Sequence, residues 1–184
     1  LEGPFTAVGA AGPRLMAFGA GGVAVSSDGL EWTFIADPAL AGGEVSGLAT
    51  GGPGLVAVGI SYGHAAVWVS PPPADGQMPG ADTGFTPEWT RIDDQAFGGE
   101  GSQRISQIIA GGPGLVAVGS DTVVTHTGGA VQVSGGPSDG VVWVSVDGAT
   151  WTRVNGEAFA GARVVTMVPG GPGLVAAGSA PHWE

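Results

Sequence analysis

Three charged residues occupy the same position in a repeated pattern, and their types could bind a charged ligand. Glu44, Arg104 and Arg163 each lie seven residues before a Gly-Gly-Pro segment. An arginine guanidinium forms paired hydrogen bonds with a carboxylate. If the fold brings the three positions together at one end of neighbouring strands, we interpret them first as an ordinary solvated rim and second as a ligand-binding site.

Two further residues are candidates for ligand binding. Tyr62 is the chain's single tyrosine and falls in a predicted loop. His126 falls in an insertion from 120 to 140, where the strand-like segments 122–127 and 130–134 flank Gly128-Gly129, a typical hairpin turn. Because no second histidine lies near His126, we predict no metal site. We assign no catalytic residue and no cofactor.

Two aspartates stand in matching short segments that read S-x-D-G-x-x-W. The residues concerned are Ser26, Asp28, Gly29 and Trp32 in the first segment, and Ser145, Asp147, Gly148 and Trp151 in the second. Aspartate in a turn commonly accepts hydrogen bonds from nearby backbone amides. We therefore predict a structural role for both carboxylates, with Trp32 and Trp151 mostly buried between sheets.

Composition excludes several classes of function. The 184 residues include 37 Gly, 14 Pro and no Cys, with a net charge of −11. Nucleic acids require clustered cations, so neither a nucleic acid nor an anionic membrane surface is an expected partner. The absence of cysteine excludes a disulfide framework. The chain contains no apolar run near the ~20 residues that a membrane span needs, so we predict no membrane insertion.

These residues must be positioned by a repeated unit of four strands. The segment GGPGLVAVG occurs at 51–59 and 111–119, and GGPGLVAAG occurs at 170–178. Short β-branched segments separated by Gly, Pro and Asp turns indicate strands. We predict strands at 5–10, 15–19, 22–26, 31–36, 44–50, 54–60, 65–70, 88–92, 104–110, 114–119, 141–146, 150–154, 162–168 and 173–178.

Four antiparallel strands that repeat every 40–60 residues match the blade of a β-propeller. We therefore predict an all-β fold and one domain over 1–184, with blades at about 4–42, 43–99 and 102–160 and a partial blade at 161–184. Propellers typically have 4–8 blades. Three and a half blades form an incomplete ring, so we expect self-association or the missing blades of a longer chain.

The S-x-D-G-x-x-W segments resemble the Asp-box, or bacterial neuraminidase repeat, of sialidase-like β-propellers. The usual pattern, S-x-D-x-G-x-T-W, has one more residue between Asp and Trp. The resemblance implies that both aspartates lie on outer blade turns, away from a central site. Sialidase-like enzymes bind a sugar carboxylate with three arginines, of which Arg104 and Arg163 would be two, but Glu44 replaces the third and no clear Tyr–Glu nucleophile pair is visible.

Two functions remain open at this point. The first is a non-catalytic propeller that acts as an extracellular scaffold or as a binding module for a glycan or a protein. The second is a fragment of a sialidase-like glycoside hydrolase. We favour the first, because the acid and nucleophile that glycosidic cleavage requires are not recognisable. We expect a secreted or cell-surface location, although no signal peptide is visible at the N-terminus.

Overall fold

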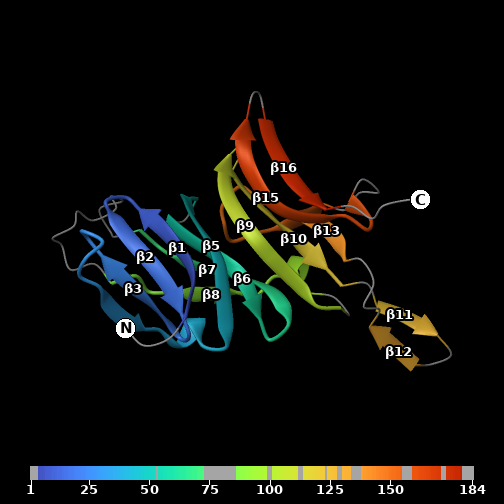
Figure 1. Ribbon diagram of the computed structural model, residues 1–184, viewed down its shortest axis with the longest axis horizontal. Helices are drawn as coiled ribbons and strands as arrows, with labels where there is room; N and C mark the ends of the chain where they lie inside the picture. The colour runs from blue at the N-terminus through green and yellow to red at the C-terminus, as the bar shows by residue number, and fades with distance from the viewer. Residues whose placement is uncertain are drawn as a thin grey trace.

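The fold consists of antiparallel strands joined by short turns (Figure 1). The computed structural model describes residues 4–52, 54–72, 86–98, 101–111, 114–122, 124–127, 130–133, 138–154, 159–170 and 173–179. Within these ranges there is no α-helix, and short 3-10 helices occur at η1 (Pro38–Leu40) and η2 (Gln95–Phe97). The all-β prediction is confirmed for this part of the chain.

Each predicted repeat forms its own sheet, with strands in chain order. The first sheet contains β1 (Phe5–Ala11), β2 (Arg14–Gly19), β3 (Gly22–Ser26) and β4 (Thr33–Ala36). The second contains β5 (Gly43–Gly51), β6 (Gly54–Ser61), β7 (His64–Ser70) and β8 (Thr90–Ile92). The third contains β9 (Gln103–Gly111), β10 (Gly114–Asp121), β13 (Asp139–Ser145) and β14 (Thr152–Val154).

The remaining strands form two hairpins. The insertion in the third repeat contains β11 (Val124–Thr127) and β12 (Ala130–Val133), as predicted; its turn, 128–129, lies outside the described residues. The last repeat contributes β15 (Arg163–Gly170) and β16 (Gly173–Ser179). Every residue of β16 is exposed. No described helix is long and apolar enough to cross a membrane.

The fourth strand of each sheet begins two residues later than the predicted start, at 33, 90 and 152. Trp32, Trp89 and Trp151 were placed inside these strands, but β4, β8 and β14 begin one residue later, at a threonine. The backbone amide of Trp151 explains the difference, because it donates to the Asp94 carboxylate instead of a neighbouring strand. The amide of Trp89 likewise donates to Asp37.

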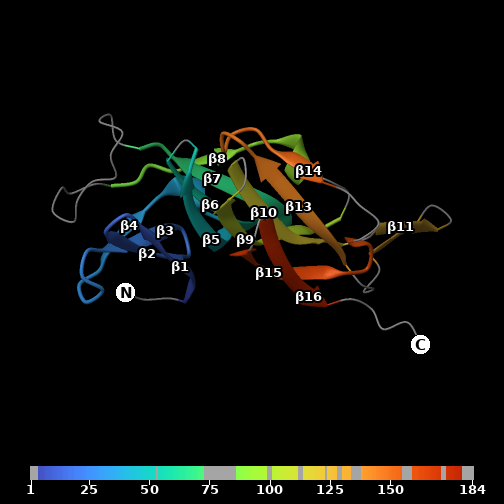
Figure 2. The same ribbon diagram turned by 90° about the horizontal axis from the view of Figure 1, so that it is seen from above.

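The sheets pack face to face in chain order through their first strands. β1 contacts β5, β5 contacts β9, and β9 contacts β15. These strands run next to one another across Figure 1, and Figure 2 shows β8 and β14 on the opposite side of the molecule. A separate cluster of buried apolar side chains fills each space between neighbouring sheets.

The second sheet is buried on both faces, which explains its continuous apolar strands. Alternate side chains of β6 point in opposite directions. Leu55 and Ala57 pack toward the first sheet, whereas Val56 and Val58 pack toward the third. All four are at most 1% exposed. A sheet between two others needs apolar residues at every position, as the repeated LVAV segment provides.

A β-bulge recurs in the first strand of every sheet and explains the last glycine of the repeated segment. The pairing between the first two strands slips by one residue at Thr6, Ser46, Ser106 and Val165. Opposite the second and third bulges, a Cβ on Gly59 would lie 2.0 Å from the Glu44 carbonyl oxygen, and one on Gly119 would lie 1.9 Å from that of Arg104. Both glycines are therefore required by close backbone approach.

Candidate functional site

Two of the three charged residues predicted to form a binding site contact each other. Glu44, Arg104 and Arg163 each lie two residues before the bulged residue of β5, β9 or β15. Arg104 Nη2 donates to Glu44 Oε1 at 2.6 Å. Arg163 is exposed and forms no ion pair with any residue that the structure describes. Glu44 thus neutralises Arg104, so this end of the first strands is not an arginine cluster.

Tyr62 and His126 do not join this pair. Tyr62 lies in the β6–β7 turn with a φ of 51° and is 76% exposed. Its ring lies against Gly42, where a Cβ would be 2.6 Å from the Tyr62 hydroxyl oxygen. His126 lies on β11, but its side chain is outside the described part of the structure. The predicted ligand-binding residues therefore do not assemble into one site among the side chains described.

The two S-x-D-G-x-x-W turns form the hydrogen bonds predicted for them. In the first turn, Asp28 Oδ1 accepts the amides of Leu30 and Glu31 at 2.8 and 3.0 Å. In the second, Asp147 Oδ1 accepts the amides of Ala149 and Thr150 at 2.9 and 2.7 Å. The serines of the two segments complete the turns, because the hydroxyl oxygens of Ser26 and Ser145 accept the amides of Gly29 and Gly148.

These amide donors stabilise the charged form of each aspartate. The Glu31 and Leu30 amides lower the pKa of Asp28 below its ordinary value of 3.8. The Thr150 and Ala149 amides lower the pKa of Asp147 in the same way. A carboxylate with a lowered pKa is a poor general acid near neutral pH. Both groups therefore act as structural acceptors.

The tryptophans of these turns differ in burial. In each turn the indole Nε1 donates to the preceding glycine carbonyl, from Trp32 to Gly29 and from Trp151 to Gly148. Trp151 is 4% exposed and contacts Phe97, with ring centroids 5.8 Å apart. Trp32 remains partly exposed. The predicted burial is therefore confirmed for Trp151, which contacts Phe97 of η2, whereas Trp32 is buried only in part.

A further pair of aspartates connects neighbouring sheets, a role that the sequence analysis missed. Asp94 Oδ1 accepts the Ala96 amide and so caps η2, while its Oδ2 accepts the Trp151 amide of the third sheet. Trp143 Nε1 of the third sheet donates to the Ala96 carbonyl at 2.8 Å. Equivalent bonds link the first and second sheets through Asp37, Ala39, Trp68 and Trp89. We call each set an inter-sheet joint.

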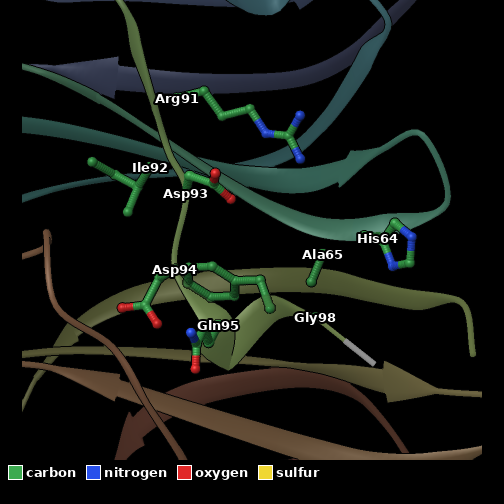
Figure 3. Close-up of a pocket in the computed structure, with 9 residues that line it drawn as sticks. His64, Ala65, Arg91, Ile92, Asp93, Asp94, Gln95 and Gly98 are labelled. Carbon is green, nitrogen blue, oxygen red and sulfur yellow. The ribbon is translucent and has the colours of Figure 1, made fainter. Parts of the chain in front are cut away.

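A pocket of about 540 Å³ opens beside the second sheet and η2 (Figure 3). It is lined by His64, Ala65, Arg91, Ile92, Asp93, Asp94, Gln95, Phe97 and Gly98, and we call it the Arg91 pocket. The Arg91 guanidinium, the Asp93 carboxylate and the His64 ring lie around the same opening in Figure 3. Asp94 holds the inter-sheet joint with both oxygens, so Asp93 is the carboxylate left to meet a ligand.

Arg91 has an equivalent in the third sheet that is already paired. Arg91 pairs across the ladder with Trp68, and Arg153 pairs with Trp143 at the same place. Arg153 Nη2 donates to Asp121 Oδ2 at 2.5 Å. Arg91 forms no ion pair with any described residue. The two equivalent arginines therefore differ, since Arg153 is ion-paired and Arg91 is exposed.

A chain of side-chain hydrogen bonds connects this closed arrangement to the Arg91 pocket. Gln103 is fully buried, and its Nε2 donates to Asp121 Oδ1 at 2.9 Å. The Gln103 Oε1 lies 3.0 Å from His64 Nδ1. We call Arg153, Asp121, Gln103 and His64 the closed corner. Its last member, His64, also lines the pocket.

Alignment of the repeats reveals one sequence difference that concerns Arg91 and Arg153. Counted from the glycine opposite the bulge, Asp121 and Ser61 hold the same position, two residues after Gly119 and Gly59. The third sheet therefore has a carboxylate where the second has a hydroxyl. His64 and Gln103 carried no such signal, since their contact joins residues 39 apart in the chain.

The described residues contain no group of three or more His, Asp or Glu side chains placed to hold a metal ion. Comparison with known proteins gives no relative, because no family model, curated protein or solved structure matches the chain. The function must therefore be argued from the geometry alone.

Proposed function

We propose that this chain is a non-catalytic repeat module of the β-propeller type that binds a ligand on a rigid stack of sheets. One observation carries the proposal: carboxylates at the repeated positions are already used by the fold. Asp28 and Asp147 accept amides of their own turns, and Asp37 and Asp94 hold the inter-sheet joints. Glu44 is paired with Arg104.

The arrangement of the sheets supports the propeller type. Three four-stranded antiparallel sheets and one hairpin follow one another, each packed on the next through its first strand. Stacking of four-stranded blades around an axis produces this neighbour relation. Among the described residues, β16 is exposed and pairs only with β15. Completion of a ring requires further blades, from another copy of the chain or from a longer one.

Light scattering of the purified protein tests the self-association that this proposal includes. At micromolar concentration we expect a mass above the 17.9 kDa of one chain, because an unpaired strand edge recruits another strand. A soluble monomer that is stable over days would exclude completion of the ring by other copies.

Glycoside hydrolysis has weaker support than binding. Most retaining and inverting glycosidases use two carboxyl groups that flank the scissile bond, whereas sialidases use a tyrosine as the nucleophile. The lining of the Arg91 pocket contains no tyrosine. In the Arg91 pocket Asp93 and Asp94 are neighbours in sequence. Both carboxylate oxygens of Asp94 already accept hydrogen bonds from backbone amides of the inter-sheet joint. The pocket therefore supplies a single carboxylate for chemistry.

An activity screen paired with a binding screen tests the proposal. Sialosides and nitrophenyl glycosides are incubated with the protein, and the same preparation is applied to a glycan array. We expect retention of at least one glycan class without turnover. Turnover that Arg104→Ala abolishes would overturn the proposal in favour of a sialidase-like hydrolase.

A further inference from the structure

We propose that the Arg91 pocket binds a hydroxylated carboxylic acid of monosaccharide size, which is the chemistry of a uronic acid. This assignment rests on the binding function proposed above and names the ligand class. The volume of about 540 Å³ lies within the usual range of small-molecule sites. The lining combines one guanidinium, two carboxylates, one imidazole and one amide with a small apolar base. One of the carboxylates, Asp94, is held by the inter-sheet joint.

Arg91 supplies the group that recognises the carboxylate. Its equivalent in the third sheet, Arg153, is neutralised by Asp121, whereas Ser61 stands at that position in the second sheet. The Arg91 guanidinium therefore reaches the pocket without a carboxylate partner among the described residues. Paired hydrogen bonds from a guanidinium to a carboxylate give both affinity and orientation.

His64 supplies an acceptor whose direction is fixed by its neighbours. Asp121, as a carboxylate, can only accept hydrogen bonds, so the Gln103 amide must turn its NH₂ toward Asp121. The Gln103 oxygen then faces His64 Nδ1, which must carry the hydrogen. In the neutral imidazole with hydrogen on Nδ1, Nε2 carries the lone pair and accepts from a ligand hydroxyl. The buried Gln103 thus acts as a positioning residue for the pocket.

Asp93 and Gln95 extend the match to a polyhydroxylated ligand. Asp93 is exposed, directly follows the end of β8, and lines the same pocket as Arg91 (Figure 3). A carboxylate accepts hydroxyl hydrogens, and the Gln95 amide both donates and accepts. Acceptors and donors beside one arginine suit an acid that carries hydroxyls on its other carbons.

The charge of the whole protein restricts the ligand to a single acidic group. The chain carries a net charge of −11, which repels polyanions at long range. A sugar acid with one negative charge is repelled less than a polyanion, and the Arg91 contact offsets this repulsion at short range. Polymers with a carboxylate on every unit are therefore poor ligands.

Isothermal titration calorimetry with sodium glucuronate tests the assignment, with glucose and alanine as comparison ligands. We expect saturable glucuronate binding to the wild-type protein and no detectable binding of glucose, which lacks the carboxylate. Glucose binding of equal strength would overturn the assignment. Alanine binding without glucuronate binding would also overturn it, since the pocket would then recognise an amino acid.

Two matched variants locate the binding. Arg91→Gln should weaken glucuronate binding roughly ten- to hundredfold, the usual effect of losing a charged hydrogen bond. Arg163→Gln removes the same charge from an exposed position of β15 and should leave the affinity unchanged. Equal weakening by both variants would show that only net charge matters and would overturn the assignment.

A third variant copies the closed corner into the second sheet. Ser61→Asp places a carboxylate at the position that Asp121 holds, where it should capture Arg91 and weaken glucuronate binding by a similar factor. Circular dichroism and the melting temperature confirm folding, and Arg91→Gln serves as the second test if Ser61→Asp fails to fold. Absence of glucuronate binding without turnover of any glycoside would refute this assignment alone, whereas turnover would refute the proposed function.

Discussion

The second and third sheets use the same scaffold but differ at one corner. Both place a fully buried tryptophan opposite an arginine, as Trp68 with Arg91 and Trp143 with Arg153. In the third sheet the arginine is held by Asp121 and the corner is closed. In the second sheet Ser61 takes that place and a pocket lies in front of Arg91.

This difference shows how a repeat can diverge without a change of fold. The two sheets share the joint, the bulge and the tryptophan, but β10 ends with Asp121, which pairs with Arg153, whereas β6 ends with Ser61. The closed corner also contributes to the Arg91 pocket, because Gln103 of the third sheet orients His64 of the second. Hydrogen bonds within the third sheet therefore fix the orientation of a side chain on the surface of the second sheet.

The largest expected effect tests whether the two scaffolds are equivalent. Trp68→Ala and Trp143→Ala each remove a fully buried indole and its bond to a joint carbonyl. We expect each to lower the free energy of unfolding by about 3–5 kcal/mol. Urea unfolding measures both values. Costs that differ by more than a factor of two between the variants would contradict a shared scaffold.

The next effect separates the two corners. Asp121→Ala removes the carboxylate oxygen that accepts from the buried Gln103 amide, and we expect a loss of about 1–3 kcal/mol. Ser61→Ala removes a hydroxyl that forms no described hydrogen bond and should cost about 1 kcal/mol or less. Thermal unfolding gives both values. Similar costs would mean that the carboxylate has no special role in closing the corner.

Asp121→Ala also tests the link between the corners. Without Asp121 the Gln103 amide is free to rotate, so His64 loses its fixed donor and acceptor. We expect weaker glucuronate binding, although Asp121 is not among the pocket residues. Unchanged affinity in a folded Asp121→Ala protein would show that His64 does not depend on the closed corner.

The second and third sheets also differ at the turn before the fourth strand, and this difference should affect stability in acid. The third sheet has the Asp147 turn, whereas an insertion separates Ser70 from Trp89 in the second. Because the folded pKa of Asp147 is lowered, its stabilisation is present above the ordinary value of 3.8 and is lost as pH falls through the folded pKa. The same holds for Asp28.

We therefore expect Asp147→Asn to flatten the fall of the melting temperature between about pH 5 and pH 2, because position 147 then has no carboxylate to protonate. Thermal scans of both proteins across this range provide the measurement. Parallel profiles for variant and wild type would show that the turn carboxylate does not contribute to acid unfolding.

The smallest effect concerns the ion pair that connects the second and third sheets. Arg104 and Glu44 have side chains that are 40% and 46% exposed. Exposed pairs contribute about 0–1 kcal/mol. Arg104→Gln should therefore change the unfolding free energy by less than about 1 kcal/mol, and raising the salt concentration should remove that difference. A loss of several kcal/mol would mean that this pair, and not the joint, holds the sheets together.

The strands were predictable because each is encoded locally. Short β-branched segments, Gly-Pro turns and the S-x-D-G-x-x-W segments placed the strands of the sheets to within two residues. The bonding of Asp28 and Asp147 was predictable for the same reason, since donor and acceptor lie within three residues of each other.

The site was not predictable because its contacts join distant residues. Asp94 reaches Trp151 across 57 residues, and His64 reaches Gln103 across 39. Neither distance leaves a local pattern. The alignment of Arg91 with Arg153 was visible, but the meaning of Ser61 in place of Asp121 required the register of β6 and β10.

The two inter-sheet joints give the second sheet, which takes part in both, a polarity. One face presents an aspartate and a 3-10 helix, and the other presents a tryptophan indole and amide, so a sheet can follow its neighbour only head to tail. Head-to-tail contacts are heterologous; they generate a closed ring when the rotation per unit divides the circle and an open helical array when it does not. Duplication of one unit would lengthen the series in the same sense, without a new interface.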